Sequence, residues 1–143
     1  NGEAAARAQI LVAEDSPVNQ VVVTSMLKRL GFTVDVCTNG QSAVEMALKT
    51  PYSAILMDCQ MPILDGFEAT AQIRNLERAL ARPRRTPIIA LTANALSGDR
   101  EKCLAAGMDD HIPKPLQIKT LQEALATQVP GALPGALFSP ANQ

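Results

Sequence analysis

The 143-residue chain has no tryptophan, one tyrosine and three phenylalanines, so aromatic side chains make up only 3% of it. Since 47% of the residues are nevertheless hydrophobic, the core has to be built from aliphatic side chains. This length predicts one domain with a full core. The shortage of aromatic residues disfavours a flavin carrier, as does the lack of a Thr/Ser/Gly-rich loop after the first predicted strand.

An excess of charge of one sign is also absent, because the chain has 13 Lys and Arg residues and 14 Asp and Glu residues, which gives a net charge of -1. We therefore expect no direct binding to nucleic acid and no membrane contact. No apolar run approaches the roughly 20 residues of a membrane-spanning helix, and no secretory leader is recognisable. These absences predict a soluble cytoplasmic domain, whose parent protein could be anchored in a membrane.

Cysteine is scarce and widely spaced. Cys37, Cys59 and Cys103 are odd in number and form no CxxC motif, which fits neither a disulfide framework nor a zinc site. We interpret them as reduced thiols of a cytosolic protein.

Short apolar runs alternate with segments of helical periodicity. We predict strands over residues 9–13, 33–37, 54–58, 86–91 and 109–113, and helices over residues 17–30, 41–49, 66–81, 97–106 and 116–129. Strands that alternate with helices through short loops predict right-handed crossovers and a parallel sheet. The predicted fold is α/β, a doubly wound five-stranded parallel sheet of flavodoxin-like order 2-1-3-4-5 with helices on both faces.

Residues 9–129 form the predicted domain. Residues 1–8 are small, polar and aperiodic, and we interpret them as a linker or an artificial remnant. Residues 130–143 are rich in Pro, Gly and Ala, and we interpret them as a linker or tail.

The predicted helix 66–81 has one apolar side. We expect four of its residues to face the sheet and four to face solvent: Phe67, Ala71, Ile73 and Leu76 on the first side, and Glu68, Arg74, Glu77 and Arg78 on the second. Residues 82–85, Arg-Pro-Arg-Arg, break the helix. We interpret them as a solvated loop, with an arginine cluster for an acidic partner as the alternative.

Chemically active side chains follow four of the five predicted strands. Glu14 and Asp15 follow the first strand, and Asp58, Thr92 and Lys114 end or follow the third, fourth and fifth. Each has an ordinary explanation by itself, as a helix start, a strand end or a surface charge. Because parallel strands bring their carboxyl ends to one edge, we expect all of them to meet there.

Three neighbouring carboxylates repel one another unless a cation lies among them. Oxygen ligands without histidine or cysteine favour a hard ion such as Mg²⁺. An ammonium group and a hydroxyl group opposite the metal suit the oxygens of a phosphoryl group. The pattern predicts a site for metal and phosphate in which the central carboxylate, Asp58, is the nucleophile.

Five segments together resemble the receiver domain of two-component response regulators: residues 11–16, 56–62, 65–66, 90–93 and 114–116. The resemblance implies that Asp58 is the phosphoacceptor and that Glu14, Asp15 and the backbone carbonyl of Gln60 complete the Mg²⁺ site with it. It further implies that the phosphoryl donor is a phosphohistidine on a histidine kinase or a histidine phosphotransfer domain.

The same resemblance assigns Thr92 and Lys114 to the phosphoryl oxygens, with Thr92 moving on phosphorylation, and implies a cis peptide between Lys114 and Pro115. Receivers often carry Tyr or Phe as the partner of this switching threonine, where the chain has His111. His111 is therefore either a switch residue or an ordinary half-buried or surface ring.

Residues 14–20 and 108–111 are most similar to receivers attached to hybrid sensor histidine kinases. In these, the first helix and the loop after the fifth strand dock a helical phosphotransfer protein. The corresponding docking residues are Pro17, Val18, Val22, Pro115 and Leu116, and ordinary helix surface is the alternative.

Three other functions remain open at this point: a stand-alone response regulator, an interaction module that works without phosphorylation, and a Mg²⁺-dependent phosphatase. A missing acid or lysine would favour the interaction module, and none is missing. A phosphatase would need a general acid two residues after Asp58, where Gln60 stands.

Overall fold

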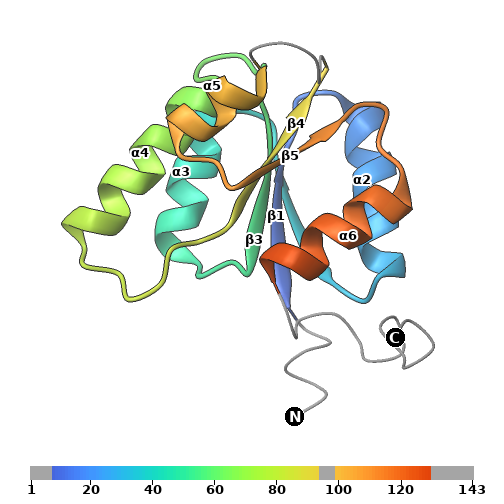
Figure 1. Ribbon diagram of the computed structural model, residues 1–143, viewed down its shortest axis with the longest axis horizontal. Helices are drawn as coiled ribbons and strands as arrows, with labels where there is room; N and C mark the ends of the chain where they lie inside the picture. Colours follow the sequence, from blue (N-terminus) through green and yellow to red (C-terminus); the bar gives the residue numbers. More distant parts are fainter. Residues whose placement is uncertain (1–7, 94–98, 130–143) are drawn as a thin grey trace.

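The computed structural model describes residues 8–93 and 99–129, in which a parallel sheet lies between two layers of helices (Figure 1). In chain order the elements are β1 (Gln9–Ala13), α2 (Pro17–Arg29), β2 (Thr33–Cys37), α3 (Gly40–Lys49), β3 (Ala54–Asp58), α4 (Gly66–Ala79), β4 (Ile88–Thr92), α5 (Asp99–Ala106), β5 (Asp110–Pro113) and α6 (Ile118–Gln128). The strand order is β2-β1-β3-β4-β5 and every pairing is parallel. The predicted fold is confirmed.

The element ends differ from the prediction by one or two residues at several places. The fourth strand begins at Ile88, after Pro87, and the last helix begins at Ile118, beyond Pro115. Proline lacks the N–H group that a strand would use, which moves the start of β4 along the chain, whereas the last helix begins after its N-cap residue Gln117. The predicted helix start at Ser97 lies outside the described residues, as do residues 1–7 and 130–143.

The core is aliphatic and has two halves, one on each face of the sheet. Ile10, Val12 and Leu56 pack on the face covered by α2 and α6, whereas Leu11 and Met57 pack on the face covered by α3, α4 and α5 (Figure 1). Central strands buried on both faces need continuous apolar runs, which is why these strands do not alternate with polar residues.

One side of α4 differs from the prediction. Ala71 is exposed, Glu77 is half-buried and Arg74 is buried with 6% of its surface accessible. The Arg74 guanidinium donates hydrogen bonds to the carbonyls of Gly107 and Thr86 and pairs with the carboxylates of Glu77 and Asp109 at 2.9 and 2.8 Å. Arginine can be buried when its donors are paired in this way, so Arg74 was wrongly placed in solvent.

Asp109 explains why a cation is favourable at the position of Arg74. Its Oδ2 atom accepts from Arg74 and from the backbone N–H of Ile88, and its Oδ1 atom accepts from Arg85. Arg74 therefore connects α4 with the start of β4 and with the turn before β5.

The basic loop after α4 is exposed or half-exposed, in agreement with the solvated loop that we predicted. Its arginines nevertheless bind the protein itself. Arg82 donates to the carbonyls of Ala47 and Leu48 at the end of α3, and Arg84 donates to the carbonyls of Tyr52 and Ser53. These bonds satisfy carbonyls that a helix end and a turn leave without partners.

Arg74→Met should lower the free energy of unfolding by roughly 3 kcal/mol, because it removes a buried cation from Glu77 and Asp109 and a hydrogen-bond donor from the Thr86 carbonyl. Urea denaturation followed by circular dichroism measures this change. Arg78→Met, on the exposed side of the same helix, is the matched control and should change the value by less than about 0.5 kcal/mol. Equal effects of the two substitutions would contradict the bracing role of Arg74.

Candidate functional site

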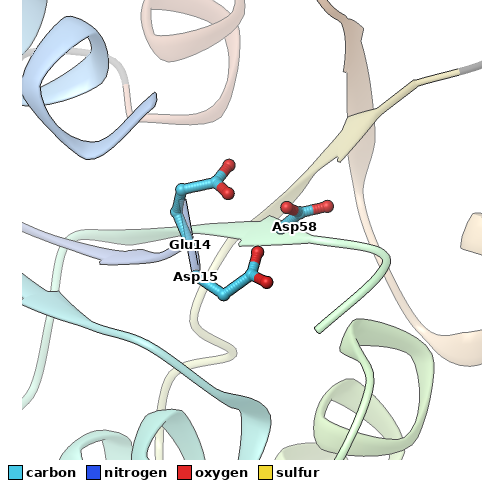
Figure 2. A group of neighbouring side chains, drawn as sticks. All are labelled: Glu14, Asp15 and Asp58. Atoms are coloured by element: carbon cyan, nitrogen blue, oxygen red, sulfur yellow. The ribbon is translucent and has the colours of Figure 1, made fainter. Parts of the chain in front are cut away.

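Three carboxylates lie at the carboxyl edge of the sheet, where β1 and β3 end. Figure 2 shows the side chains of Glu14 and Asp15 directed toward Asp58, and one oxygen from each residue lies within 4.8 Å of the other two. Glu14 and Asp58 are buried, and Asp15 is exposed. An acidic cluster of this kind, with oxygen donors only, can hold a hard divalent cation such as Mg²⁺.

Lys114 brings a positive charge into the same site from the end of β5. Its Nζ atom lies 2.9 Å from Asp58 Oδ2 and 3.2 Å from Glu14 Oε1. Burial alone would lower the pKa of Lys114, but the two carboxylates outweigh burial and raise the pKa above its ordinary value. Lys114 is thus held as a cation beside Asp58.

The surroundings of Glu14 disfavour its charged form. Burial raises its pKa, a hydrogen bond of 3.1 Å from the Ser16 N–H offsets part of the rise, and the nearby Asp58 adds to it. A buried carboxylate with a raised pKa next to a second carboxylate is stabilised by additional positive charge. One lysine does not neutralise three acids, so the residues present fit a bound metal ion.

Thr92 and His111 lie on the paired strands β4 and β5 but are not opposite each other. Thr92 is buried at the end of β4, and none of the described residues bonds to its hydroxyl group. His111 is half-buried in β5, where it lies opposite Ala90. The backbone instead connects Thr92 to the site, because its carbonyl accepts from the Lys114 N–H at 2.8 Å.

The segment after β3 folds tightly back on Asp58. The Gln60 N–H donates to Asp58 Oδ1 at 3.1 Å, and a Cβ atom on Gly66 would lie only 2.2 Å from the Asp58 carbonyl oxygen. A Cβ atom on Gly40 would lie 2.1 Å from the carbonyl oxygen of Leu64. Only glycine permits these two approaches, which hold the loop and thereby the Asp58 carboxylate. The peptide between Lys114 and Pro115 is cis, as predicted.

Comparison with known proteins identifies this arrangement. A sequence model of the response regulator receiver domain matches residues 10–126. The chain belongs to the receiver domain family. The resemblance inferred from its motifs is confirmed.

Two solved structures illustrate the similarity of this receiver domain to others. The receiver domain of the sensor histidine kinase PA1611 from Pseudomonas aeruginosa, which has a magnesium ion coordinated in its active site cleft, is 50% identical with a TM-score of 0.78, over 86% of this chain and 98% of that chain. A co-crystal structure of the histidine phosphotransfer protein Ypd1 with the receiver domain of Ssk1 from Saccharomyces cerevisiae matches at 30% identity with a TM-score of 0.79, over 86% and 89%.

Curated relatives of the receiver domain include much longer kinases. Hybrid signal transduction histidine kinase I from Dictyostelium discoideum is 40% identical over 85% of this chain, which corresponds to 7% of that protein. The kinase BarA from Escherichia coli K12 is 37% identical over 86% of this chain and 13% of that protein. The chain thus spans a small part of the relatives that it matches. None of the helices within the described ranges is long and apolar enough to cross a lipid bilayer.

A cavity of about 360 Å³ opens above the acids of the receiver domain. It is lined by the three acids, by Gln60 and Lys114, and also by Lys102 of α5. Lys102 is not among the site residues that the sequence motifs predict. Its position on the helix that follows β4 at the same edge is the signal that could have suggested a second cation there.

The predicted docking residues fall into two groups. Val22, Pro115 and Leu116 line a groove of about 120 Å³ together with Glu14 and Lys114 of the site. Pro17 and Val18 are exposed on α2 and do not line this groove, and 72% of Val18 is accessible. The groove therefore brings together Val22 of α2 and the loop between β5 and α6, whereas the start of α2 lies outside it.

Asp15→Asn should weaken Mg²⁺ binding at least about tenfold, because it removes the exposed carboxylate of the cluster. Isothermal titration calorimetry with MgCl₂ measures this loss. Glu45→Gln, an exposed change on α3, is the matched control and should leave the affinity unaltered. Unchanged binding by the Asp15 variant would exclude that residue from the metal site.

Proposed function

We propose that this receiver domain accepts a phosphoryl group from a phosphohistidine onto Asp58, in a Mg²⁺-dependent step of a two-component phosphorelay. The observation that carries the proposal is the position of the Asp58 carboxylate, which lies beside Glu14 and Asp15 and 2.9 Å from the Nζ atom of Lys114. The 30% identity to the co-crystal structure that contains Ypd1 and the Ssk1 receiver domain supports the phosphohistidine donor.

The transfer requires little acid–base chemistry. A carboxylate oxygen of Asp58 attacks phosphorus, an O–P bond forms and the P–N bond to the donor imidazole breaks. The imidazole leaves with the electron pair of that bond and takes up a proton. Lys114 would then pair with the phosphoryl oxygens in place of the carboxylate, and so neutralise charge that moves onto them.

Glu14, Asp15, Asp58 and the backbone carbonyl of Gln60 would hold the metal ion. When bound, Mg²⁺ supplies positive charge for the carboxylates and for the phosphoryl oxygens. Asp15 is the exposed member of the set, whereas burial keeps Glu14 in one position. Magnesium in the active site cleft of the PA1611 receiver domain supports this assignment.

The hydroxyl group of Thr92 is the second group that we assign to the phosphoryl oxygens. It is buried and no described residue bonds to it, so it has a hydrogen bond to gain from a phosphoryl group. Movement of Thr92 toward Asp58 would also displace the end of β5, because the Thr92 carbonyl accepts a hydrogen bond from the Lys114 N–H. His111 is assigned as the switch partner on its position in β5, next to the strand of Thr92.

The partner in our proposal is a histidine kinase or a histidine phosphotransfer domain, and the parent protein is a cytoplasmically exposed hybrid kinase. The kinases among the curated relatives support this context. The docking surface comprises the groove residues Val22, Pro115 and Leu116 with the adjacent Pro17 and Val18 of α2. Apolar residues beside an active site suit the apolar side of a partner helix.

Asp58→Asn should abolish phosphorylation. The wild-type protein, incubated with Mg²⁺ and acetyl phosphate, should gain one phosphoryl group that is stable in acid and labile in base. Intact mass spectrometry measures the adduct. Asp65→Asn, at the N-cap of α4, is the control for loss of a neighbouring acid and should still be phosphorylated. An adduct that persists in the Asp58 variant would refute the proposed acceptor.

Val22→Glu should slow transfer from a phosphorylated histidine phosphotransfer protein at least about tenfold, because it puts a charge into the docking groove. The rate of phosphorylation by acetyl phosphate should change much less, since a small donor needs no docking surface. Leu80→Glu, an exposed apolar position at the end of α4, is the control. Equal transfer to both variants would exclude the groove as the docking surface.

A further inference from the structure

Two cysteine side chains meet directly beside the phosphoryl site. Cys59 follows Asp58 at the end of β3, and Cys103 lies on α5, 44 positions further along the chain. Their sulfur atoms are 3.9 Å apart and both side chains are buried. The S–S bond of a disulfide measures about 2 Å, so the sulfurs need to approach by only about 2 Å to form one.

We propose that Cys59 and Cys103 are a modification site, at which a small-molecule disulfide such as oxidised glutathione converts the two thiols into a reversible disulfide. The thiolate of Cys59 attacks one sulfur of the oxidant, which releases one glutathione thiol and leaves a mixed disulfide on Cys59. The thiolate of Cys103 then attacks the Cys59 sulfur and releases the second glutathione thiol. Two protein thiols are oxidised and one disulfide of the oxidant is reduced.

The surroundings of the pair assign the first step to Cys59. Cys59 lines the cavity above Asp58 and also a second, adjoining cavity of about 560 Å³, both of which include Lys102. Cys103 lines neither cavity and is 1% exposed. A dissolved oxidant therefore reaches the sulfur of Cys59 first, and Cys103 is the resolving thiol that lies within reach behind it.

The third cysteine has a different environment. Cys37 ends the edge strand β2, and its Sγ atom lies 3.7 Å from the carbonyl oxygen of Asn39. The sulfur of Cys37 thus contacts a backbone carbonyl oxygen, whereas the sulfur of Cys59 contacts that of a second cysteine. Cys37 is thus an internal control, since its oxidation would reveal a reaction that does not require the close approach of Cys59 and Cys103.

The effect on signalling rests on the proposed function. The disulfide would tie the residue after Asp58 to α5, the helix that follows β4 and Thr92. Cys59 is already bound to β4, because its N–H donates to the Leu91 carbonyl at 3.2 Å. A cross-link across this point restrains the segment that has to move when Thr92 turns toward a phosphoryl group. We expect the oxidised receiver domain to accept the phosphoryl group more slowly.

Peptide mapping tests the modification itself. The folded, reduced chain is treated with oxidised glutathione, alkylated after unfolding and digested for mass spectrometry. We expect a Cys59–Cys103 cross-link that dithiothreitol reverses, while Cys37 is recovered in alkylated form. Glutathione adducts without the cross-link, cross-links to Cys37 in equal yield, or no oxidation of the folded chain would each overturn the proposal.

Phosphorylation by acetyl phosphate tests the consequence. Oxidation should slow the wild-type protein at least about fivefold. Cys103→Ala should lose both the cross-link and this slowing, whereas the matched variant Cys37→Ala should keep both. Equal rates for the cross-linked and reduced proteins would overturn the regulatory role. A reduced protein that takes up no phosphoryl group would contradict the proposed function instead, and the peptide map still decides whether the disulfide forms.

Discussion

The ion pair between Lys114 and Asp58 is the contact on which the site depends. Three carboxylates crowd one edge of the sheet, and two of them are buried, so their mutual repulsion opposes the folded arrangement. Lys114 reaches both buried acids and offsets part of this repulsion. The remaining negative charge suits a divalent cation, which in the proposed function would prepare Asp58 for an incoming phosphoryl group. The same acids that suit the site to a cation therefore lower the stability of the folded chain at this edge.

The rest of the fold holds that edge in place. The aliphatic strands β1, β3 and β4 are buried on both faces and fix where their ends lie. Close backbone approaches at Gly40 and Gly66 set the loop after Asp58. At the other end of β4, Arg74 connects α4 to the β5 side of the sheet through Asp109. The site residues are thus attached to a rigid frame, which a signalling domain needs if a local change is to reach a distant surface.

Much of the molecule could be predicted from the chain alone. The all-apolar runs ending at Asp58 and Thr92 predict buried parallel strands, and parallel strands place their ends at one edge whatever the packing details. The side of α4 was harder to predict. Arg74 has the polarity of a surface residue, and its burial becomes favourable through partners such as Asp109, 35 positions away. Lys102 was missed for a similar reason, since a lysine on a short helix has no local pattern that distinguishes a cavity wall from open surface.

The sequence by itself determined the fold, the strand order and the family, because hydrophobic periodicity and the residues at strand ends are local properties that survive without coordinates. Tertiary structure alone decided which distant atoms meet. The Nζ atom of Lys114 at Asp58, the guanidinium of Arg74 at Asp109 and the sulfur of Cys103 at Cys59 join residues that lie 35 to 56 positions apart. No local pattern encodes those distances, which follow from how the helices pack against the twisted sheet.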